Sequence, residues 1–185
     1  MLSRLVCRRN RGANGSKNAA SSGSASGEAL GTLLIFILHS TTETNKVVLA
    51  RQFGATDVIT SSGEQAAQQV IDMTQGGADA VLECVGTEET IKMAVNISRP
   101  GGNVGFVGAP HGSGQIPLGR MFSYNIGLHG GLAPARAYLP ELLEEVLAGR
   151  LNPSPVLDLT VSLAEVASGY TAMDQRQAIK VMVRP

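Results

Sequence analysis

Three glycine-containing segments are the strongest candidates for a ligand-binding site in this sequence. Val85-Gly86, Val107-Gly108 and the run from Gly127 to Gly131 each accompany a short apolar stretch that is typical of a β-strand. Glycine lacks a Cβ atom, so its backbone can approach a ligand closely. Ligands of open α/β sheets bind at the carboxyl ends of the strands. These turns are therefore candidate contacts for a bound ligand, and the alternative is that the glycines only form turns.

The cysteines and histidines form no recognisable pattern for metal binding or nucleophilic catalysis. Cys7 and Cys84 are far apart in sequence, so neither a disulfide framework nor a metal cluster is predicted. Cys84 ends an apolar strand pattern and is expected to be a buried thiol rather than a reactive one. His39, His111 and His129 have no paired thiolate, and there is no Gly-x-Ser-x-Gly motif. We therefore predict no catalytic residue and no metal ligand.

Short apolar runs alternate with helical patterns from Leu33 onward, which is typical of a parallel sheet with crossover helices. Apolar residues at helical spacing from Ala67 to Thr74, and from Ile91 to Val95 after a Thr87 N-cap, predict helices packed on this sheet. Gly54 and Gly76-Gly77 follow helical patterns and are expected to supply left-handed caps. Strands apolar on both faces are expected to be covered on both sides. The predicted strands are Leu34 to Leu38, Asp57 to Thr60, Ala80 to Cys84, Asn103 to Val107 and Asn125 to His129.

The pattern changes character beyond Gly131. An amphipathic stripe from Tyr138 to Leu147 predicts a helix with a broad buried face. Ser162 and Glu165 are spaced as a capping box, which predicts a further helix. Ile179 to Val183 is predicted to close the chain as a strand.

Four separated segments occur in a distinctive order and spacing, and they are Ala50 to Ile59, Gly77 to Gly86, Arg99 to Gly108 and Asn125 to Gly131. Together they resemble the coenzyme-binding domain and C-terminal segment of the zinc-dependent medium-chain alcohol dehydrogenase family. The resemblance implies an α/β fold with an incomplete Rossmann-like parallel sheet, flanking helices and a C-terminal helix-strand extension. It divides the chain into a disordered leader (1–32), a partial dinucleotide-binding domain (33–132) and a C-terminal segment (133–185).

The resemblance also implies a set of NAD(P) contacts. Residues after the strand that ends near Cys84 flank the adenosine side in the family, while backbone groups matching Val107, Gly127 and His129 bond the nicotinamide carboxamide. Lys180 falls where the family places a basic residue near the pyrophosphate, and the alternative for Lys180 is a solvated charge. The implied cofactor-binding residues are Cys84, Val85, Gly86, Val107, Gly108, Gly127, His129 and Lys180.

Two features of the family are missing from the sequence. No Gly-x-Gly-x-x-Gly loop follows a strand, although such a loop would hold the pyrophosphate at a helix N-terminus. Thr41 and Thr42 stand where an acidic residue would accept the ribose hydroxyls, so NAD and NADP are not distinguished. The N-terminal half that supplies zinc ligands in the family has no counterpart, so zinc belongs to the family but not to the residues of this chain.

Charge and composition restrict the partners of the chain. The first 27 residues contain five basic residues and no acidic one, so the remainder, with ten basic and fifteen acidic residues, is acidic. An acidic body argues against a nucleic-acid partner, and the apolar run from Leu33 to Leu38 is too short for a membrane helix. Residues 12–27 have a composition typical of disorder. We expect a cytoplasmic location, with mitochondrial import as the minor alternative because the leader is basic.

Two functional hypotheses follow. The first is a truncated alcohol dehydrogenase-like oxidoreductase, with NAD(P)-dependent hydride transfer between alcohol and carbonyl, which is not expected to catalyse unaided. The second is a non-catalytic remnant of the same fold that acts as a partner-binding or dimerisation module. The strand from Asn125 to His129, with Met121 and Phe122 beside it, would be the edge through which a homodimer forms.

Overall fold

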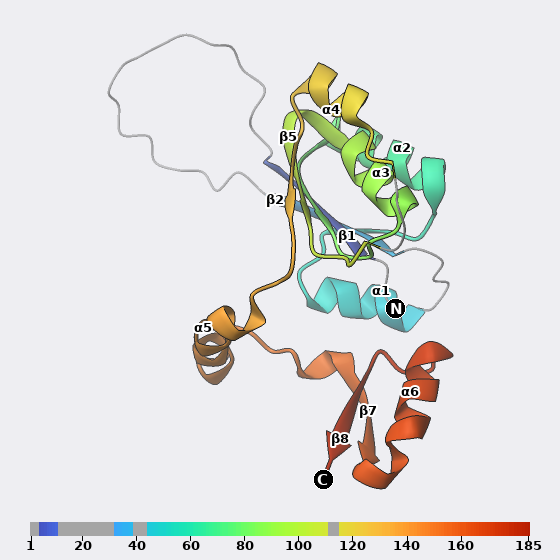
Figure 1. Cartoon of the computed structure of the whole chain (residues 1–185), viewed down its shortest axis with the longest axis vertical. Helices are drawn as coiled ribbons and strands as arrows, with labels where there is room; N and C mark the ends of the chain where they lie inside the picture. Colours follow the sequence, from blue (N-terminus) through green and yellow to red (C-terminus); the bar gives the residue numbers. More distant parts are fainter. Residues whose placement is uncertain (1–3, 11–31, 39–43, 111–114) are drawn as a thin grey trace. The chain divides into compact units, whose positions relative to one another are not determined.

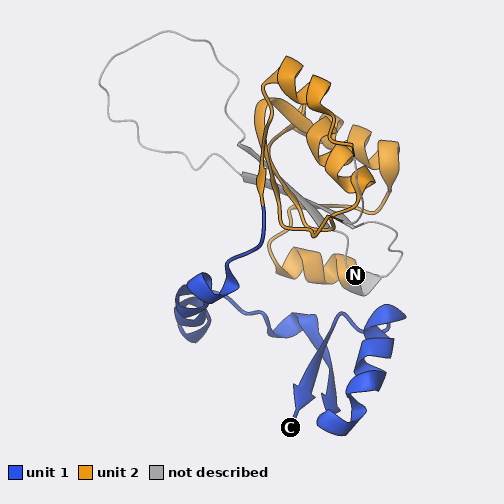
Figure 2. Cartoon of the chain, viewed as in Figure 1, with its two compact units in different colours: residues 1–3, 131–185 blue, residues 4–130 orange. Residues whose placement is uncertain are grey.

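The structure is a computed structural model that describes residues 4–10, 32–38, 44–110 and 115–185. Two compact units are present, one formed by Arg4–Gly130 and the other containing Gly131–Pro185 (Figure 2). The boundary predicted from the sequence, between residues 132 and 133, lies two residues further along the chain. The segment predicted to be disordered, residues 12–27, lies outside the described residues, as do His39, Thr41, Thr42 and His111.

A single sheet organises the first unit (Figure 1). Its strands lie in the order β3-β2-β1-β4-β5-β6, which is the spatial order of a doubly wound dinucleotide-binding sheet. The strands are β1 (Arg4–Asn10), β2 (Thr32–Leu38), β3 (Asp57–Ile59), β4 (Ala78–Glu83), β5 (Ser98–Phe106) and β6 (Gly127–Gly130). The five strands predicted from the sequence are all present, so the predicted α/β sheet is confirmed.

Strand β1 was not predicted, since the sequence assigned it to a leader without structure. The three pairs β2-β3, β4-β5 and β5-β6 are parallel, as expected. In contrast, β1 runs antiparallel to both of its neighbours, β2 and β4. Asn10, at its carboxyl end, pairs with Thr32 at the start of β2, so the chain leaves β1 at the edge of the sheet opposite to the carboxyl ends of β2 and β4.

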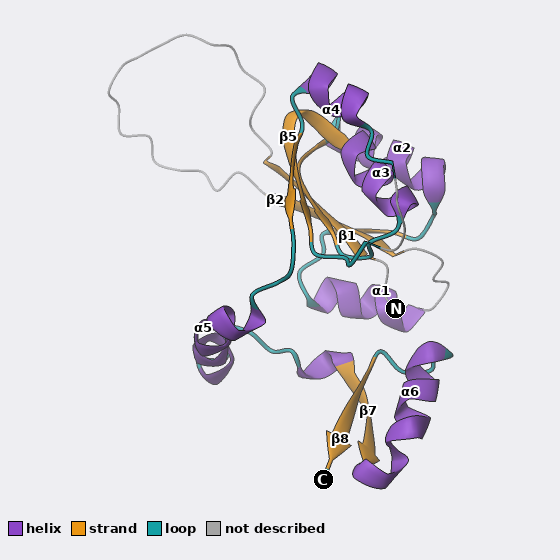
Figure 3. Ribbon diagram, viewed as in Figure 1, coloured by secondary structure: helices purple, strands orange, loops and turns teal. Residues whose placement is uncertain are grey.

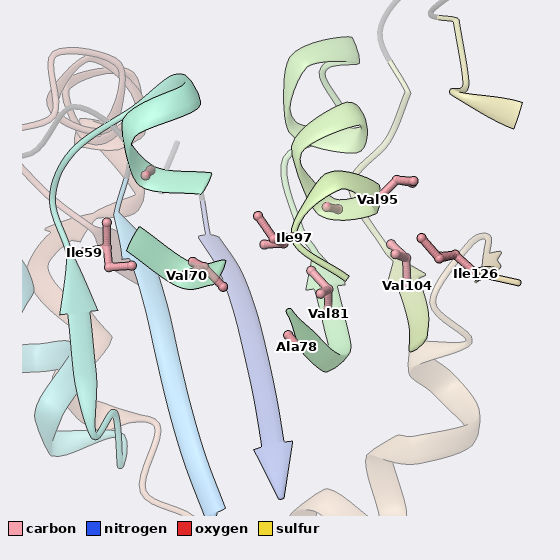
Figure 4. Close-up of a cluster of buried hydrophobic side chains, with 10 residues drawn as sticks. Ile59, Val70, Ala78, Val81, Val95, Ile97, Val104 and Ile126 are labelled. Atoms are coloured by element: carbon pink, nitrogen blue, oxygen red, sulfur yellow. The ribbon is translucent and has the colours of Figure 1, made fainter. Parts of the chain in front are cut away.

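Helices α2 (Gly63–Thr74) and α3 (Glu88–Asn96) lie side by side over one face of the sheet (Figure 3). They bury their apolar stripes against β3, β4 and β5, which makes the main hydrophobic core (Figure 4). Helix α1 (Thr44–Gln52) buries Leu49 and Ala50 outside this cluster, and α4 (Leu118–Tyr124) adjoins α3. The core residues are Ile59, Ala66, Val70, Ala78, Val81, Ala94, Val95, Ile97, Val104 and Ile126.

Helix ends follow the local signals in the sequence, with one exception. Thr87 caps α3, accepting a hydrogen bond from the Thr90 N–H at 3.2 Å, as predicted. Gly54 takes the predicted left-handed conformation after α1, with φ of +87°. At the end of α2 the left-handed C-cap is Gln75, with φ of 52°, rather than a glycine. The glycine that follows, Gly76, donates its N–H to the Ile71 carbonyl at 3.0 Å.

The prediction that apolar strands would be covered on both faces is wrong for β4. Val81 is buried in the core, while Leu82, its neighbour on the other face, is about half exposed at 49%. Helices α2 and α3 cover only the face that carries Val81, which explains the alternation of buried and exposed residues.

The second unit contains α5 (Ala135–Leu147), two short 3₁₀ turns at Ser154–Val156 and Leu163–Glu165, β7 (Leu157–Ser162), α6 (Val166–Asp174) and β8 (Lys180–Arg184). Strand β7 was not predicted, and it pairs in parallel with β8 beneath α6. The predicted capping box forms, because the Glu165 carboxylate accepts from the Ser162 N–H at 3.1 Å.

Helix α5 has the predicted apolar stripe but not the predicted buried face. Tyr138, Leu139, Leu142 and Leu143 are all exposed. Throughout the described part of the chain, no helix combines the length and the apolar character needed to span a bilayer.

Candidate functional site

The candidate site lies where β4 and β5 end, at the turns formed by Val85-Gly86 and Val107-Gly108. This edge adjoins the position at which the strand order reverses, between β1 and β4, and that position is where doubly wound sheets bind dinucleotides. Because β4 and β5 are parallel neighbours, with Glu83 beside Phe106, the two turns emerge together. The structure therefore brings these two predicted glycine turns together.

Glu83 lies beneath both turns and was not predicted as a functional residue. Its side chain is fully buried, and Oε1 accepts hydrogen bonds from the N–H groups of Val85 at 2.8 Å and Gly86 at 2.9 Å. The Thr90 hydroxyl of α3 donates to the same oxygen at 2.8 Å. The second oxygen, Oε2, is buried and has no hydrogen-bond partner among the described residues.

The main chain of Glu83 binds the second turn. Its carbonyl oxygen accepts from the N–H of Val107 at 2.9 Å and, at a longer 3.3 Å, from the N–H of Gly108. All four N–H groups of the two turns are therefore bonded to one residue. The sequence did contain a signal for Glu83, because it is the one charged residue within the apolar run from Ala80 to Val85.

The two glycines of these turns are required by contact between the turns themselves. A Cβ atom on Gly108 would lie 2.5 Å from the Val85 carbonyl carbon and 2.6 Å from the Val85 nitrogen. A Cβ atom on Gly86 would lie 2.6 Å from the carbonyl carbon of Ala109, and Gly86 also has a φ of +89°. Such distances are far below ordinary van der Waals contact of about 3.5–4.0 Å. The turns consequently approach each other more closely than any other residue type would allow.

The third predicted turn is placed differently from the expectation. Strand β6 begins at Gly127, beside Asn103, and ends at Gly130, beside Phe106. The sequence predicted a strand from Asn125 to His129, whereas the observed strand begins two residues later, at Gly127, and its last residue, Gly130, reaches the edge where β4 and β5 end. The absence of a side chain at Gly127 makes room for Asn103, because an added Cβ would clash with the Asn103 Oδ1 atom. His129 lies within β6 opposite Gly105, and its side chain is exposed.

Two further residues predicted to contact a cofactor, Cys84 and Lys180, do not belong to the Val85-Gly86 and Val107-Gly108 turns. Cys84 follows β4 directly and is half-buried. Lys180 is the first residue of β8 in the second unit, and its side chain is exposed. Its backbone N–H donates a hydrogen bond to the Asp158 carboxylate at 3.2 Å. Lys180 is therefore held by a contact within its own unit.

The helix that follows the first turn is poorly suited to bind an anion. Helix N-termini attract phosphate groups through their unpaired N–H groups and their positive dipole end. The first turn of α3 instead carries Glu88 and Glu89. The Lys92 ammonium, which is hydrogen-bonded to the Glu88 carboxylate, holds the pKa of Glu88 below its usual range, so this position stays negatively charged at neutral pH.

The side chains near the two turns also bear on whether a catalytic zinc ion could bind. Zinc needs three or more closely placed Cys, His, Asp or Glu side chains. Within the described ranges no group of three or more such residues could hold a metal ion. The described residues therefore do not fit a zinc centre.

The sequence and the structure were compared with known proteins. A family model described as zinc-binding dehydrogenase matches residues 28–148, which is more than half of the chain. A probable zinc-binding alcohol dehydrogenase of Mycobacterium tuberculosis is 32% identical over 141 residues, covering 74% of this chain and 35% of that protein. An S-(hydroxymethyl)glutathione dehydrogenase of Photobacterium damsela subsp. piscicida is 26% identical over 152 residues, covering 77% of this chain and 40% of that protein.

Solved structures agree with these relatives. An alcohol dehydrogenase of Thermus sp. ATN1 superposes with a TM-score of 0.71 at 29% identity, covering 80% of this chain and 43% of that chain. A zinc-dependent alcohol dehydrogenase of Streptococcus pneumonia has a TM-score of 0.73 at 23% identity, which shows a shared fold, and covers 82% of this chain and 44% of that chain. The chain thus spans less than half the length of each of these relatives.

Proposed function

The chain belongs to the zinc-binding dehydrogenase family, and on that basis we propose that it forms part of the NAD(P)-binding portion of an alcohol dehydrogenase-like oxidoreductase. The observation that carries this proposal is the pair of tightly packed turns, Val85-Gly86 and Val107-Gly108, at the carboxyl ends of adjacent parallel strands beside the reversal of strand order. Relatives named as alcohol dehydrogenases support the reaction class, which is hydride transfer between an alcohol and a nicotinamide cofactor.

We assign the cofactor contacts by resemblance to the family. Cys84, Val85 and Gly86 would flank the adenosine side, while Val107 and Gly108 would lie near the nicotinamide. The Val107 N–H is bonded to Glu83, so the group it can offer is its carbonyl oxygen, which accepts a hydrogen bond from a carboxamide NH₂. A bound nicotinamide would supply the hydride chemistry, and these residues would orient it.

Gly127, His129 and Lys180 are assigned as cofactor contacts by resemblance. Gly127 and His129 belong to β6, which pairs with β5, the strand that Val107 follows. Lys180 would meet the pyrophosphate, and this assignment has its own test. Substituting Lys180 with Ala should weaken NADPH and NADH binding in a salt-dependent manner, because a lost cation contact is an electrostatic effect. An unchanged affinity at low salt would leave Lys180 as a solvated charge.

The affinity for the cofactor should be low. Strand β1 runs antiparallel, so its carboxyl end lies opposite to those of β4 and β5, and the sequence contains no Gly-x-Gly-x-x-Gly loop of the kind that holds a pyrophosphate. Each charge-assisted hydrogen bond of such a loop is worth ~1.5–3 kcal/mol, so we expect a Kd for NADH of about 1 mM or weaker.

Thermal unfolding tests cofactor binding directly. With a Kd of about 1 mM, NADH at about 10 mM should stabilise the chain by about 1.4 kcal/mol and raise the Tm. Adenosine at the same concentration is the control for binding of the purine alone. A Tm that does not change at this NADH concentration, together with unchanged amide signals for the two turns, would refute the proposal.

We further propose that alcohol oxidation requires groups from outside the described residues. The described part of the chain has no cluster that fits a metal ion, and zinc is the Lewis acid that polarises the substrate oxygen in such enzymes. The chain alone should therefore show no alcohol-dependent formation of NADH, with or without added zinc. Turnover by the purified chain would overturn this part of the proposal.

A second candidate function is that of a dimerisation module. Strand β6 is the last strand of the sheet and is bonded to β5 on one side only. Phe122 of the adjacent helix α4 is 88% exposed, and Tyr124 and Leu118 are also exposed. A second copy of the chain could pair with this edge by a two-fold axis, which is the commonest arrangement in homodimers.

Sedimentation at micromolar concentration tests this dimer. The unchanged chain should sediment as a dimer, and Phe122→Asp should sediment as a monomer because a charge would replace an apolar contact. Leu163→Asp, at an exposed apolar residue of the other unit, is the matched control and should remain dimeric. A monomeric unchanged chain would exclude the dimer edge.

A further inference from the structure

Glu83 is a buried carboxylate for which the proposed cofactor contacts provide no role. It ends strand β4 with no exposed surface. A carboxylate is costly to bury unless hydrogen bonds replace those it made with water. Here Oε1 receives three donors, while Oε2 receives none from the described residues. An apolar residue would fill the same space without this cost, so the carboxylate calls for an explanation beyond packing.

The bonds of Glu83 connect three parts of the candidate site. Its carboxylate binds the first turn through the N–H groups of Val85 and Gly86, and it binds α3 through the hydroxyl of Thr90. Its carbonyl oxygen binds the second turn through the N–H groups of Val107 and Gly108. Glu83 is therefore bonded to both turns.

These bonds determine what the two turns can present to a ligand. The four N–H groups point inward to Glu83, so the turns can offer carbonyl oxygens and apolar surface but not N–H donors. The bonds also hold Gly86 against Gly108, where an added Cβ would clash with the backbone of the other turn. A shift of either turn would therefore change both its separation from the other and the direction of its carbonyl groups.

We propose that Glu83 is a positioning residue that holds the Val85-Gly86 and Val107-Gly108 turns at the separation and orientation needed to bind the dinucleotide cofactor. This inference rests on the proposed function. Glu83 acts through the two turns, and it makes no contact with the cofactor itself. The reach of its side chain matters more than its charge, since the role consists of accepting hydrogen bonds at the position of Oε1.

Reach and charge can be separated by substitution. Glu83→Gln keeps the length of the side chain and an acceptor oxygen, but it removes the charge. Glu83→Asp keeps the charge but shortens the side chain by one methylene, so the carboxylate withdraws from Val85 and Gly86. If Glu83 positions the turns, Gln should preserve their structure and Asp should not. If the buried charge alone matters, the order should be the reverse.

Thr74→Val is the matched control for loss of a buried side-chain hydrogen bond. Thr74 is also buried, and its hydroxyl accepts from the Gly77 N–H at 3.0 Å in the turn before β4, at the opposite end of that strand. Valine has nearly the same shape as threonine but cannot accept this bond. The control should lose stability without disturbing the turns at the carboxyl end.

The experiment measures amide hydrogen exchange at Val85, Gly86, Val107 and Gly108 and titrates NADH into each variant of the full chain. In Glu83→Asp, exchange at Val85 and Gly86 should rise by at least about tenfold relative to the core of β4, and the NADH Kd should weaken by a similar factor. Glu83→Gln and Thr74→Val should stay within about threefold of the unchanged chain in both measurements.

Two outcomes would overturn the inference. One is equal protection of the turns in the Asp and Gln variants, and the other is a Gln variant that loses protection while the Asp variant keeps it. If the unchanged chain does not bind NADH, the proposed function fails, and the exchange measurements still decide whether Glu83 holds the two turns together. The two failures are therefore distinguishable.

Discussion

The packing of the two turns leads to a quantitative prediction for Gly108→Ala. The new Cβ would lie 2.5 Å from the Val85 carbonyl carbon and 2.6 Å from the Val85 nitrogen. Contacts between such atoms are comfortable at about 3.5–4.0 Å, so the turns must separate by about 1 Å. Separation of this kind costs about 1–3 kcal/mol. It also disrupts the bond from the Gly108 N–H to Glu83, which is worth about 1 kcal/mol.

The expected destabilisation of Gly108→Ala is therefore about 2–4 kcal/mol, which for a unit of this size corresponds to a fall in Tm of roughly 6–20 °C. Circular dichroism during heating measures it. NADH binding should weaken in the folded variant because the separation of the turns has changed.

Two glycine controls separate the clash from other effects. Gly119→Ala places a Cβ in open space within helix α4, so the Tm should stay constant or rise slightly. Gly54→Ala also meets no atom within 4 Å, but its φ of +87° is unfavourable for alanine, so it measures the backbone cost alone, about 1–2 kcal/mol. If the Gly108→Ala variant had the same Tm as the Gly119→Ala variant, the close packing of the turns would be refuted.

Three further substitutions test other contacts. Arg120→Ala removes hydrogen bonds to two carbonyl groups at the C-terminal end of α3 and a contact with the Tyr124 ring. It should lower the free energy of unfolding, measured in urea, by about 1–2 kcal/mol. Arg120→Lys should recover part of this loss. Asp158→Ala removes the acceptor for two N–H groups at the start of β8 and should raise amide exchange in β7 and β8 without affecting the first unit; Asp158→Asn should retain part of the protection. Hydrogen bonds from Ser162 lower the pKa of Glu165, so its contribution to stability is complete above the unfolded carboxyl pKa of about 4.5 and is lost as pH falls through the lower folded value. Glu165→Gln should therefore show a smaller loss of stability between pH 5 and 2 than the unchanged chain, as measured by urea unfolding, and an identical loss would contradict the assignment.

Local signals in the sequence were sufficient for several elements. Thr87 and the apolar residues that follow it specify α3, because a cap and a helical stripe act within a few residues of one another. Ser162 and Glu165 specify their capping box for the same reason. The parallel strands β3, β4 and β5 were likewise evident from apolar runs between turns.

The candidate site was predicted only in part. The turns at Val85-Gly86 and Val107-Gly108 were identified correctly as neighbours, but their glycines were interpreted as leaving room for a ligand, whereas the structure uses them for contact between the turns. Glu83 was missed because its partners in the second turn are more than twenty residues away. A charged residue in an apolar run signals a buried acceptor, but it does not identify the donors.

The sequence by itself determined the alternation of strands and helices, the helix caps and the kinship of the chain, since each depends on residue types at short spacing. The three-dimensional fold was needed to show that β1 enters the centre of the sheet antiparallel, that β6 begins at Gly127 rather than at Asn125, and that one residue, Glu83, binds both turns. The physical reason is that strand direction, register and burial are fixed by hydrogen bonds and packing between segments distant in sequence, and no local pattern encodes those partners.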